Sequence, residues 1–314
     1  MAGQLAPILD ALQPDRVITD HVSLTATAAL RGLGAPFDTF VPGHPSQLPV
    51  GDERYGAPPA WPVALLPSEA ERARLLDRCR TVTERIAEAF NAAVRAIGTV
   101  AADVADPFRV YGERAFYNYS EALHDPNRVG SLPSGVSFLG PCVREEELPR
   151  QLEDAVAAVG DRPFVYVSFG TFLSQRDDVL AVVADGLRAA GVVAAIATGP
   201  TPGARLGPLP ASWIVAPELP QVALLGHASV MITHAGNNSV GEAIRAGVPM
   251  LALPFSTDQF AIAADLERLR VGRCLDPNTL TPSILGECVA GLIAGPERAA
   301  VRRLSETLAI LFDA

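Results

Sequence analysis

Residues 230–242, VMITHAGNNSVGE, join an apolar strand to a helix. We expect the helix to begin near Asn238 and to end before the sequence Gly247-Val248-Pro249. A turn of small residues between a strand and a helix presents backbone N–H groups at the positive end of the helix dipole, where a phosphate is favoured. The stretch therefore predicts a strand–turn–helix unit that binds a phosphorylated ligand.

The second half of the chain alternates short apolar strands with helices of about ten residues. The expected strands are residues 164–169, 192–197, 212–216, 229–233 and 250–253, with a short strand at Cys274. The expected helices between and after them include residues 177–190, 238–246 and 259–268. Such alternation predicts an α/β fold with a parallel, doubly wound sheet.

The first half is less regular. We expect strands at residues 16–20, 35–41, 108–111 and 136–139 and a long helix over 68–97. Pro and Gly dominate residues 42–67, which predicts an irregular loop, and the polar residues 144–150 are typical of a linker. A length of 314 residues with 49% hydrophobic content predicts two domains, which we place at residues 1–145 and 146–314.

Composition excludes several classes of function. The net charge of −10 argues against a nucleic-acid partner. All 25 basic residues are Arg, so a Walker-A lysine, a Schiff-base lysine and a pyridoxal-phosphate site are excluded. Any phosphate must therefore be held by backbone amides, hydroxyls, His or Arg.

The location predicted from the sequence is the cytoplasm. The four cysteines are scattered without a C-x-x-C pair, as in reduced cytosolic proteins, and they do not form a zinc motif. No apolar run reaches about 18 residues, so no integral membrane segment is expected. The N-terminal residues lack the pattern of a signal peptide.

Polar and glycine residues recur where the predicted strands of the second half end. Gly170 and Thr171 follow one strand, His234 begins the glycine turn after another, and Asp258 and Gln259 follow a third. Ligands of open α/β sheets bind at the carboxyl ends of the strands. The convergence of these residues predicts one ligand site there.

Individual residues of this set have structural alternatives. Asn238, Ser239 and Glu242 share one helix face, where Ser239 and Glu242 match a capping box. A glutamate is equally suited to hold the two vicinal hydroxyls of a ribose. His234 is either a strand-end histidine or a phosphate donor, and Asp258 is either a helix start or a sugar ligand.

The chain resembles a known family at these positions. The run from Leu219-Pro220-Gln221 through His227, residues 234–239, Glu242, Gly247-Val248-Pro249 and Asp258-Gln259 looks like the donor signature of family 1 nucleotide-sugar-dependent glycosyltransferases. Residues 164–171 resemble the opening of their donor domain. Residues 14–20 and 138–141 resemble markers of their acceptor domain, so the similarity touches nearly the whole chain.

The resemblance implies a GT-B fold with two Rossmann-like domains, of which the N-terminal, acceptor-binding one is incomplete. The last helix is expected to pack back on that first domain. The implied donor ligands are Gly170 and Thr171 near the phosphates; His234, Gly236, Asn237, Asn238 and Ser239 at the diphosphate; Gln221 and Glu242 at the ribose; and Asp258 and Gln259 at the transferred sugar.

The implied activity is metal-independent, inverting transfer of a sugar to a hydroxyl of a small acceptor, without a cofactor. No Asp-x-Asp pair for a metal-bridged diphosphate occurs in the sequence. Plant members stack a Trp on the base where this chain has Glu218, so UDP and dTDP donors both stay open. A nucleotide-sugar epimerase on the same architecture is a weaker alternative.

Asp20 resembles the aspartate that orients the family's general-base histidine, yet that histidine has no counterpart upstream in the sequence. His21 is adjacent, but neighbouring side chains of a strand point to opposite faces. The expected explanations are a chain whose start is missing, or a protein that has lost its base. A catalytically silent nucleotide-sugar-binding auxiliary protein, or a truncated inactive transferase, is therefore the alternative function.

Overall fold

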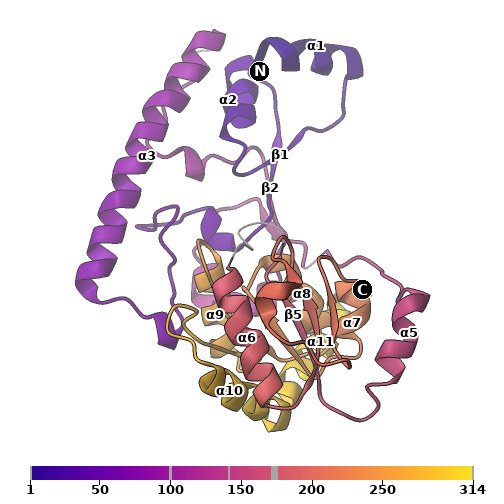
Figure 1. The fold of residues 1–314 in the computed structure, drawn as a ribbon. Helices are drawn as coiled ribbons and strands as arrows, with labels where there is room; N and C mark the ends of the chain where they lie inside the picture. Colours follow the sequence, from indigo (N-terminus) through magenta and orange to yellow (C-terminus); the bar gives the residue numbers. More distant parts are fainter. Residues whose placement is uncertain (1, 99–100, 141, 171–175, 313–314) are drawn as a thin grey trace. The chain divides into compact units, whose positions relative to one another are not determined.

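Two compact units make up the chain in the computed structural model, which describes residues 2–98, 101–140, 142–170 and 176–312 (Figure 1). The first unit comprises Met1–Pro59 and Pro67–Gly140. The second comprises Ala60–Leu66 and Pro141–Ala314. Each unit has its own parallel sheet, which confirms the predicted α/β class.

The first unit contains a four-stranded parallel sheet whose order in space, β1-β2-β3-β4, follows the sequence. Its strands are β1 (Ile18–Asp20), β2 (Asp38–Val41), β3 (Ala115–Tyr117) and β4 (Val136–Phe138). Its helices are α1 (Ala2–Leu12), α2 (Leu24–Leu33), α3 (Glu69–Ile97) and α4 (Pro126–Val129). Ala28 of α2 packs against Phe90 and Val94 of α3 in a small apolar core.

The strand predicted at residues 108–111 is wrong. Pro107–Arg109 forms a 3-10 turn, and the strand lies later, at β3. Pro107 has no N–H to give to a sheet ladder. The Asp106 carboxylate accepts a hydrogen bond from the Phe108 N–H at 2.9 Å, which caps the turn instead.

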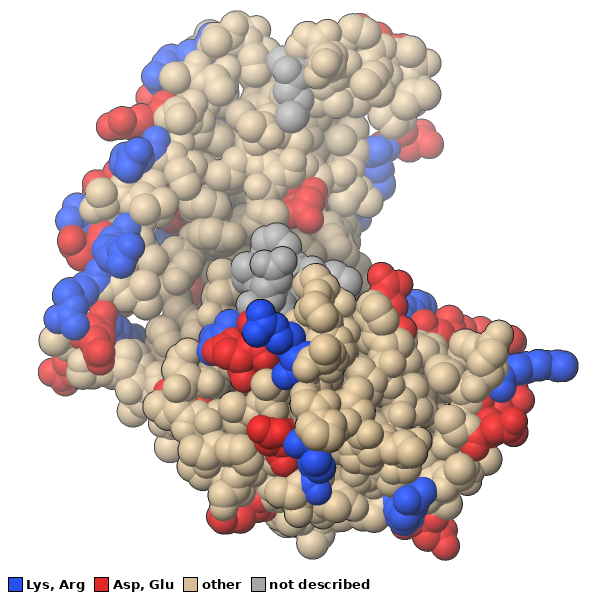
Figure 2. Space-filling model, viewed as in Figure 1, with Lys and Arg blue, Asp and Glu red and all other residues tan. Residues whose placement is uncertain are grey.

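Helix α3 shows how strongly local signals define an element. Ser68 and Glu71 form a complete capping box at its start, and Gly98 ends it in the left-handed conformation at φ 103°. Arg80 pairs with Asp77 and Glu84 along its exposed side. Basic and acidic side chains alternate along this helix in Figure 2, as expected for a solvated face.

The second unit contains a six-stranded sheet in the order β10-β9-β8-β5-β6-β7, with every neighbouring pair parallel. The strands are β5 (Phe164–Ser168), β6 (Val193–Ala197), β7 (Ile214–Ala216), β8 (Val230–Thr233), β9 (Met250–Ala252) and β10 (Gly272–Cys274). The helices are α5 (Arg150–Ala157), α6 (Asp177–Ala189), α7 (Gln221–Leu225), α8 (Asn237–Arg245), α9 (Gln259–Arg268), α10 (Pro282–Ala294) and α11 (Glu297–Phe312). This sheet is the doubly wound one that the sequence predicts.

The strand order of this sheet reverses between β5 and β8. The chain runs outward from β5 through β6 to β7, then returns to β8 on the other side of β5 and continues to β9 and β10. The register pairs Ser168, the last residue of β5, with Thr233, the last residue of β8. The loops that follow these two strands therefore start side by side at the topological switch point, where α/β sheets bind ligands.

One segment of the first half belongs to the second unit. Residues Ala60–Leu66 group with it, although the sequence places them in the loop predicted for the first domain. The Trp61 ring packs on Phe260 of α9 with ring centroids 4.8 Å apart. The Val63 N–H donates to Glu267 of the same helix at 2.8 Å.

Candidate functional site

The turn between β8 and α8 holds an unusual backbone conformation. Ala235, fully buried, has φ 64°, a left-handed conformation that non-glycine residues rarely adopt. Its N–H donates to Thr233 Oγ1 at 3.2 Å. Thr257, next to Asp258, also has a positive φ of 50°. Strained non-glycine residues concentrate at functional sites, and both of these lie beside residues predicted to bind the donor.

His234 lies between two glycines that have no room for a side chain. A Cβ added to Gly170 would be 2.8 Å from His234 Cε1, and a Cβ added to Gly236 would be 2.6 Å from the same atom. Gly170 also has φ 74°, which favours glycine. The structure thus brings three predicted residues together, Gly170, His234 and Gly236. A side chain at either glycine position would collide with the imidazole of His234. Thr171 is outside the described residues.

The His234 imidazole is neutral at physiological pH. Burial lowers its pKa to about 4, while the Asp258 carboxylate and the Ser168 backbone oppose this shift. No described residue offers His234 Nδ1 a hydrogen bond of good geometry, although that atom is buried. A neutral imidazole donates one N–H, so His234 can act as a hydrogen-bond donor without carrying a charge.

Helix α8 presents its N-terminus at the same turn. Gly236 is its N-cap, and no side chain caps the helix. Asn237, Asn238 and Ser239 form its first turn. Nine residues of helix give this end a partial positive charge that favours an anion. The end of the strand, the imidazole and the helix N-terminus together suit the phosphates of a ligand.

The capping-box alternative for Ser239 and Glu242 is wrong. The N-cap position belongs to Gly236, because the helix starts earlier than the sequence predicts. Instead, the Gln221 side-chain amide donates to Ser239 Oγ at 3.1 Å and to Glu242 Oε2 at 2.5 Å. Glu242 is buried. Three predicted residues from α7 and α8 therefore form one hydrogen-bonded group beside the turn.

The loop before α9 brings Asp258 and Gln259 to this edge of the sheet. Asp258 precedes the helix but does not cap it with its side chain. Its Oδ1 accepts from Thr257 Oγ1 at 3.0 Å. Gln259 Oε1 accepts the Phe255 and Ser256 N–H groups at 2.8 and 3.1 Å, so the oxygen of this amide holds the loop closed. Sugar binding by these two residues stays a prediction.

A model of the family described as UDP-glucoronosyl and UDP-glucosyl transferase matches residues 132–307, more than half of the chain. The chain belongs to this family. The resemblance stated from the sequence is thereby confirmed. The matched residues include the whole of the β8–α8 turn and the polar group around Gln221.

Relatives in this family are similar over much of the chain. The protein named uncharacterized UDP-glucosyltransferase YdhE of Bacillus subtilis (strain 168) is 24% identical over 84% of this chain and 63% of its own length. Oleandomycin glycosyltransferase of Streptomyces antibioticus is 28% identical over 94% of this chain and 65% of its own length. The chain therefore spans less than two thirds of either relative.

Solved structures of similar fold support the GT-B architecture. The glycotransferase of kitacinnamycin has a TM-score of 0.75 at 21% identity and covers 99% of this chain and 76% of its own. The calicheamicin glycosyltransferase CalG4 has a TM-score of 0.69 at 20% identity over 96% and 70% of the two chains. At this level of identity the likeness shows the fold alone, and that fold is GT-B, as predicted.

Among the described residues of the first unit, no histidine imidazole reaches the surface near Asp20. Asp20 Oδ1 accepts the Val22 N–H at 2.9 Å in a turn after β1. The ring of His21 is only 2% exposed, and its Nε2 shares a 2.6 Å hydrogen bond with the Gln47 carbonyl. Burial lowers the pKa of His21, so this residue is a neutral, structural histidine. Orientation of a base by Asp20 stays a prediction.

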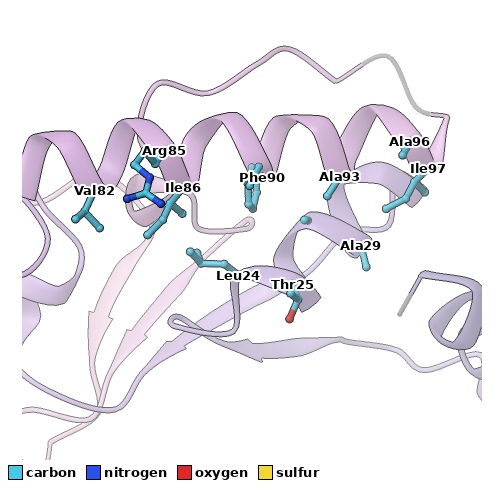
Figure 3. A pocket seen from close by; sticks show the side chains of 12 residues that line it. Leu24, Thr25, Ala29, Val82, Arg85, Ile86, Phe90, Ala93, Ala96 and Ile97 are labelled. Atoms are coloured by element: carbon cyan, nitrogen blue, oxygen red, sulfur yellow. The ribbon is translucent and has the colours of Figure 1, made fainter.

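An apolar cavity of about 780 Å³ lies in the first unit, between α2 and α3 (Figure 3). Leu24, Ala29, Ile86, Phe90 and Ile97 are among the residues that line it. Among all of the lining residues, only Arg85 carries a charge. The volume is in the range of small-molecule sites. The sequence analysis did not predict this cavity, because its two walls are distant in the chain.

Two other features near the site were also missed. The Ala60–Leu66 segment contacts α9 through Trp61 and Val63, and Glu146 reaches α7 from the predicted linker. Nothing in the sequence Glu145-Glu146-Glu147 indicates that Glu146, rather than its neighbours, accepts a hydrogen bond from α7. In the described part of the chain, no helix is both long and apolar enough for a membrane span.

Proposed function

We propose that this protein binds a UDP- or dTDP-linked sugar through its second unit and takes part in transferring that sugar to a hydroxyl of a small acceptor. The single observation that supports this most is the enclosure of His234 between Gly170 and Gly236 at the N-terminus of α8. This arrangement keeps the imidazole at a helix N-terminus that no side chain caps. Gln221 and Glu242 supply a neighbouring hydrogen-bonded pair for the ribose, and Ser239 beside them is proposed to bind the diphosphate.

The proposed chemistry is inverting and needs no metal ion. An acceptor hydroxyl attacks the anomeric carbon, the bond to the diphosphate oxygen breaks, and the nucleoside diphosphate leaves. Negative charge then grows on the leaving phosphate. The helix dipole and the neutral N–H of His234 stabilise that charge, and preorganised donors of this kind act most strongly in the transition state. Asp258 and Gln259 are proposed to hold the sugar hydroxyls.

The acceptor is proposed to be a small hydroxylated natural product. Relatives named for oleandomycin and kitacinnamycin support this class. The apolar lining of the cavity between α2 and α3 is compatible with a hydrophobic molecule. Transfer to a panel of phenols and macrolides, followed by mass spectrometry, tests the acceptor class.

Calorimetric titration with UDP and dTDP tests the donor assignment. We expect His234→Ala to weaken binding of the nucleoside diphosphate about tenfold or more, because it removes a hydrogen bond to a charged oxygen. Gly203→Ala is the control, since Gly203 lies in the same unit and a Cβ there meets nothing within 4 Å. Equal affinities for wild type and His234→Ala would refute the assignment.

A second candidate function is nucleotide-sugar binding without catalysis. It is favoured by the burial of His21, His44 and His124, which are at most 3% exposed and are the three histidines of the first unit. A general base contributes roughly 10²–10⁴-fold to rate. Tight binding of UDP or dTDP with neither donor hydrolysis nor transfer to any acceptor would favour this candidate, and turnover would exclude it.

A further inference from the structure

Residues 142–149 form hydrogen bonds to both α7 and α8. They precede α5 and have no regular secondary structure. The Val143 carbonyl accepts from Arg245 Nη1 of α8 at 3.4 Å, and Glu146 Oε2 accepts the Val222 N–H of α7 at 2.8 Å. Helices α7 and α8 pack against each other and lie together in Figure 1. The segment therefore contacts both helices that carry the predicted ribose ligands.

Glu146 replaces a missing local cap on α7. The residue before the helix, Pro220, makes no side-chain cap. Glu146 supplies a carboxylate from 76 positions earlier in the chain. Its side chain is 22% exposed, and its other oxygen accepts from Arg144 Nη2 at 3.1 Å. Both oxygens of the carboxylate are thus used, and the carboxylate has a defined orientation.

The residue next to this contact is Gln221. Because Glu146 holds the N–H of Val222, it restrains the peptide unit that carries Gln221. The Gln221 amide in turn holds both Ser239 and Glu242. Two hydrogen bonds, joined covalently through residues 221 and 222, therefore connect the Glu146 carboxylate to the Glu242 carboxylate.

The carboxylates of Glu242 and Glu146 both affect the pKa of one buried tyrosine. Tyr166 of β5 is 1% exposed, and burial is the main cause of its raised pKa. The carboxylates of Glu242 and Glu146 raise that pKa further. Glu242 is buried, and a buried carboxylate without partners is costly, so the hydrogen bond from Gln221 stabilises it. The Gln221 amide donates a hydrogen bond to the Glu242 carboxylate, and the Val222 N–H and Arg144 donate to the Glu146 carboxylate.

We propose that Glu146 is a positioning residue for the ribose of the nucleotide sugar. It fixes the start of α7, so that Gln221 holds the Glu242 carboxylate in one orientation for the ribose hydroxyls. The proposal rests on the proposed function. It concerns the recognition of the nucleoside and not the phosphate contacts of His234.

The test compares UDP with 2′,3′-dideoxyuridine diphosphate, which lacks both ribose hydroxyls. We expect the wild-type protein to prefer UDP, and Glu146→Ala to reduce that preference about tenfold by weakening binding of UDP more than binding of the dideoxy compound. Glu146→Gln keeps an acceptor oxygen and is expected to restore most of the preference. Glu147→Ala, an exposed neighbour, is the control and should match wild type.

The outcomes separate this inference from the proposed function. If wild type binds neither compound, the proposed function fails and the inference fails with it. If wild type prefers UDP and Glu242→Ala abolishes that preference while Glu146→Ala keeps it, the inference alone is overturned. It is also overturned if wild type has no preference, or if Glu146→Ala weakens both compounds equally or only lowers the melting temperature.

Discussion

Replacing Gly236 by alanine is the sharpest single test of the geometry around His234. Gly236 has φ −68° and ψ 141°, which alanine adopts without strain. The new Cβ would nevertheless lie 2.6 Å from His234 Cε1. The substitution therefore disturbs the imidazole by contact alone, and the backbone conformation is not at issue.

The size of the effect follows from this distance. Non-bonded carbon atoms normally approach to about 3.5–4.0 Å, so the imidazole or the turn must move by roughly 1 Å. The donor–acceptor distance of an N–H···O hydrogen bond spans only about 2.7–3.2 Å, so such a movement breaks the bond. A hydrogen bond to a charged group contributes about 1.5–3 kcal/mol. We therefore expect Gly236→Ala to weaken UDP binding roughly 10- to 150-fold.

Calorimetry on a double-mutant cycle separates this cause from general damage. Once His234 is already alanine, the Cβ at position 236 meets no imidazole, so Gly236→Ala should cost little in the His234→Ala background. Gly203→Ala is the control, because Gly203 lies in the same unit and a Cβ there meets nothing within 4 Å. Wild-type affinity for Gly236→Ala, or losses that simply add in the double variant, would refute the reasoning.

Two further predictions concern pH and the sugar. Above pH 6.5 His234 is neutral in both the folded and the unfolded chain. As the pH falls from 6.5 to about 4, His234 takes up a proton only in the unfolded chain. The free energy of unfolding therefore decreases by about 3 kcal/mol over this range. Thermal unfolding of His234→Gln should therefore depend less on pH over this range, and an equal loss in both proteins would contradict the cause given. Asp258→Ala should reduce the rate of sugar transfer about tenfold or more while changing UDP affinity less, because its predicted partner is the sugar; equal losses in the kinetic and calorimetric assays would exclude that role.

Much of the second unit was predictable because its signals are local. Strands β5, β6, β8 and β9 are apolar runs buried in a parallel sheet, and each is bounded by turn residues. The glycine turn after β8 was likewise predictable, since a strand, small residues and a helix follow one another directly. In the first unit three strands overlap predicted ones, and the fourth was misplaced because Pro107 and the Asp106 carboxylate form a capped 3-10 turn where the strand was expected.

The unpredicted contacts are those between residues distant in the chain. Glu146 meets Val222 across 76 positions, and Val63 meets Glu267 across 204. No spacing rule covers such separations. The capping box at Ser68 was a correct structural pattern, whereas the same pattern at Ser239 was not, because Gln221 from another helix binds both of its side chains. Tertiary partners decide between identical local patterns.

Several of the places where local rules fail lie at the proposed site. Ala235 and Thr257 have left-handed backbones, and His234 Nδ1 is buried without a well-formed hydrogen bond to any described residue. Each feature lowers the stability of the folded chain. Two other non-glycine residues, Gln13 and Arg270, also have positive φ, at 42° and 56°, but both are exposed. Ala235 differs from them because it is fully buried, next to an imidazole that is itself buried. A buried left-handed residue beside such an imidazole is expected where ligand geometry outweighs stability, and this argument for the site does not depend on any relative.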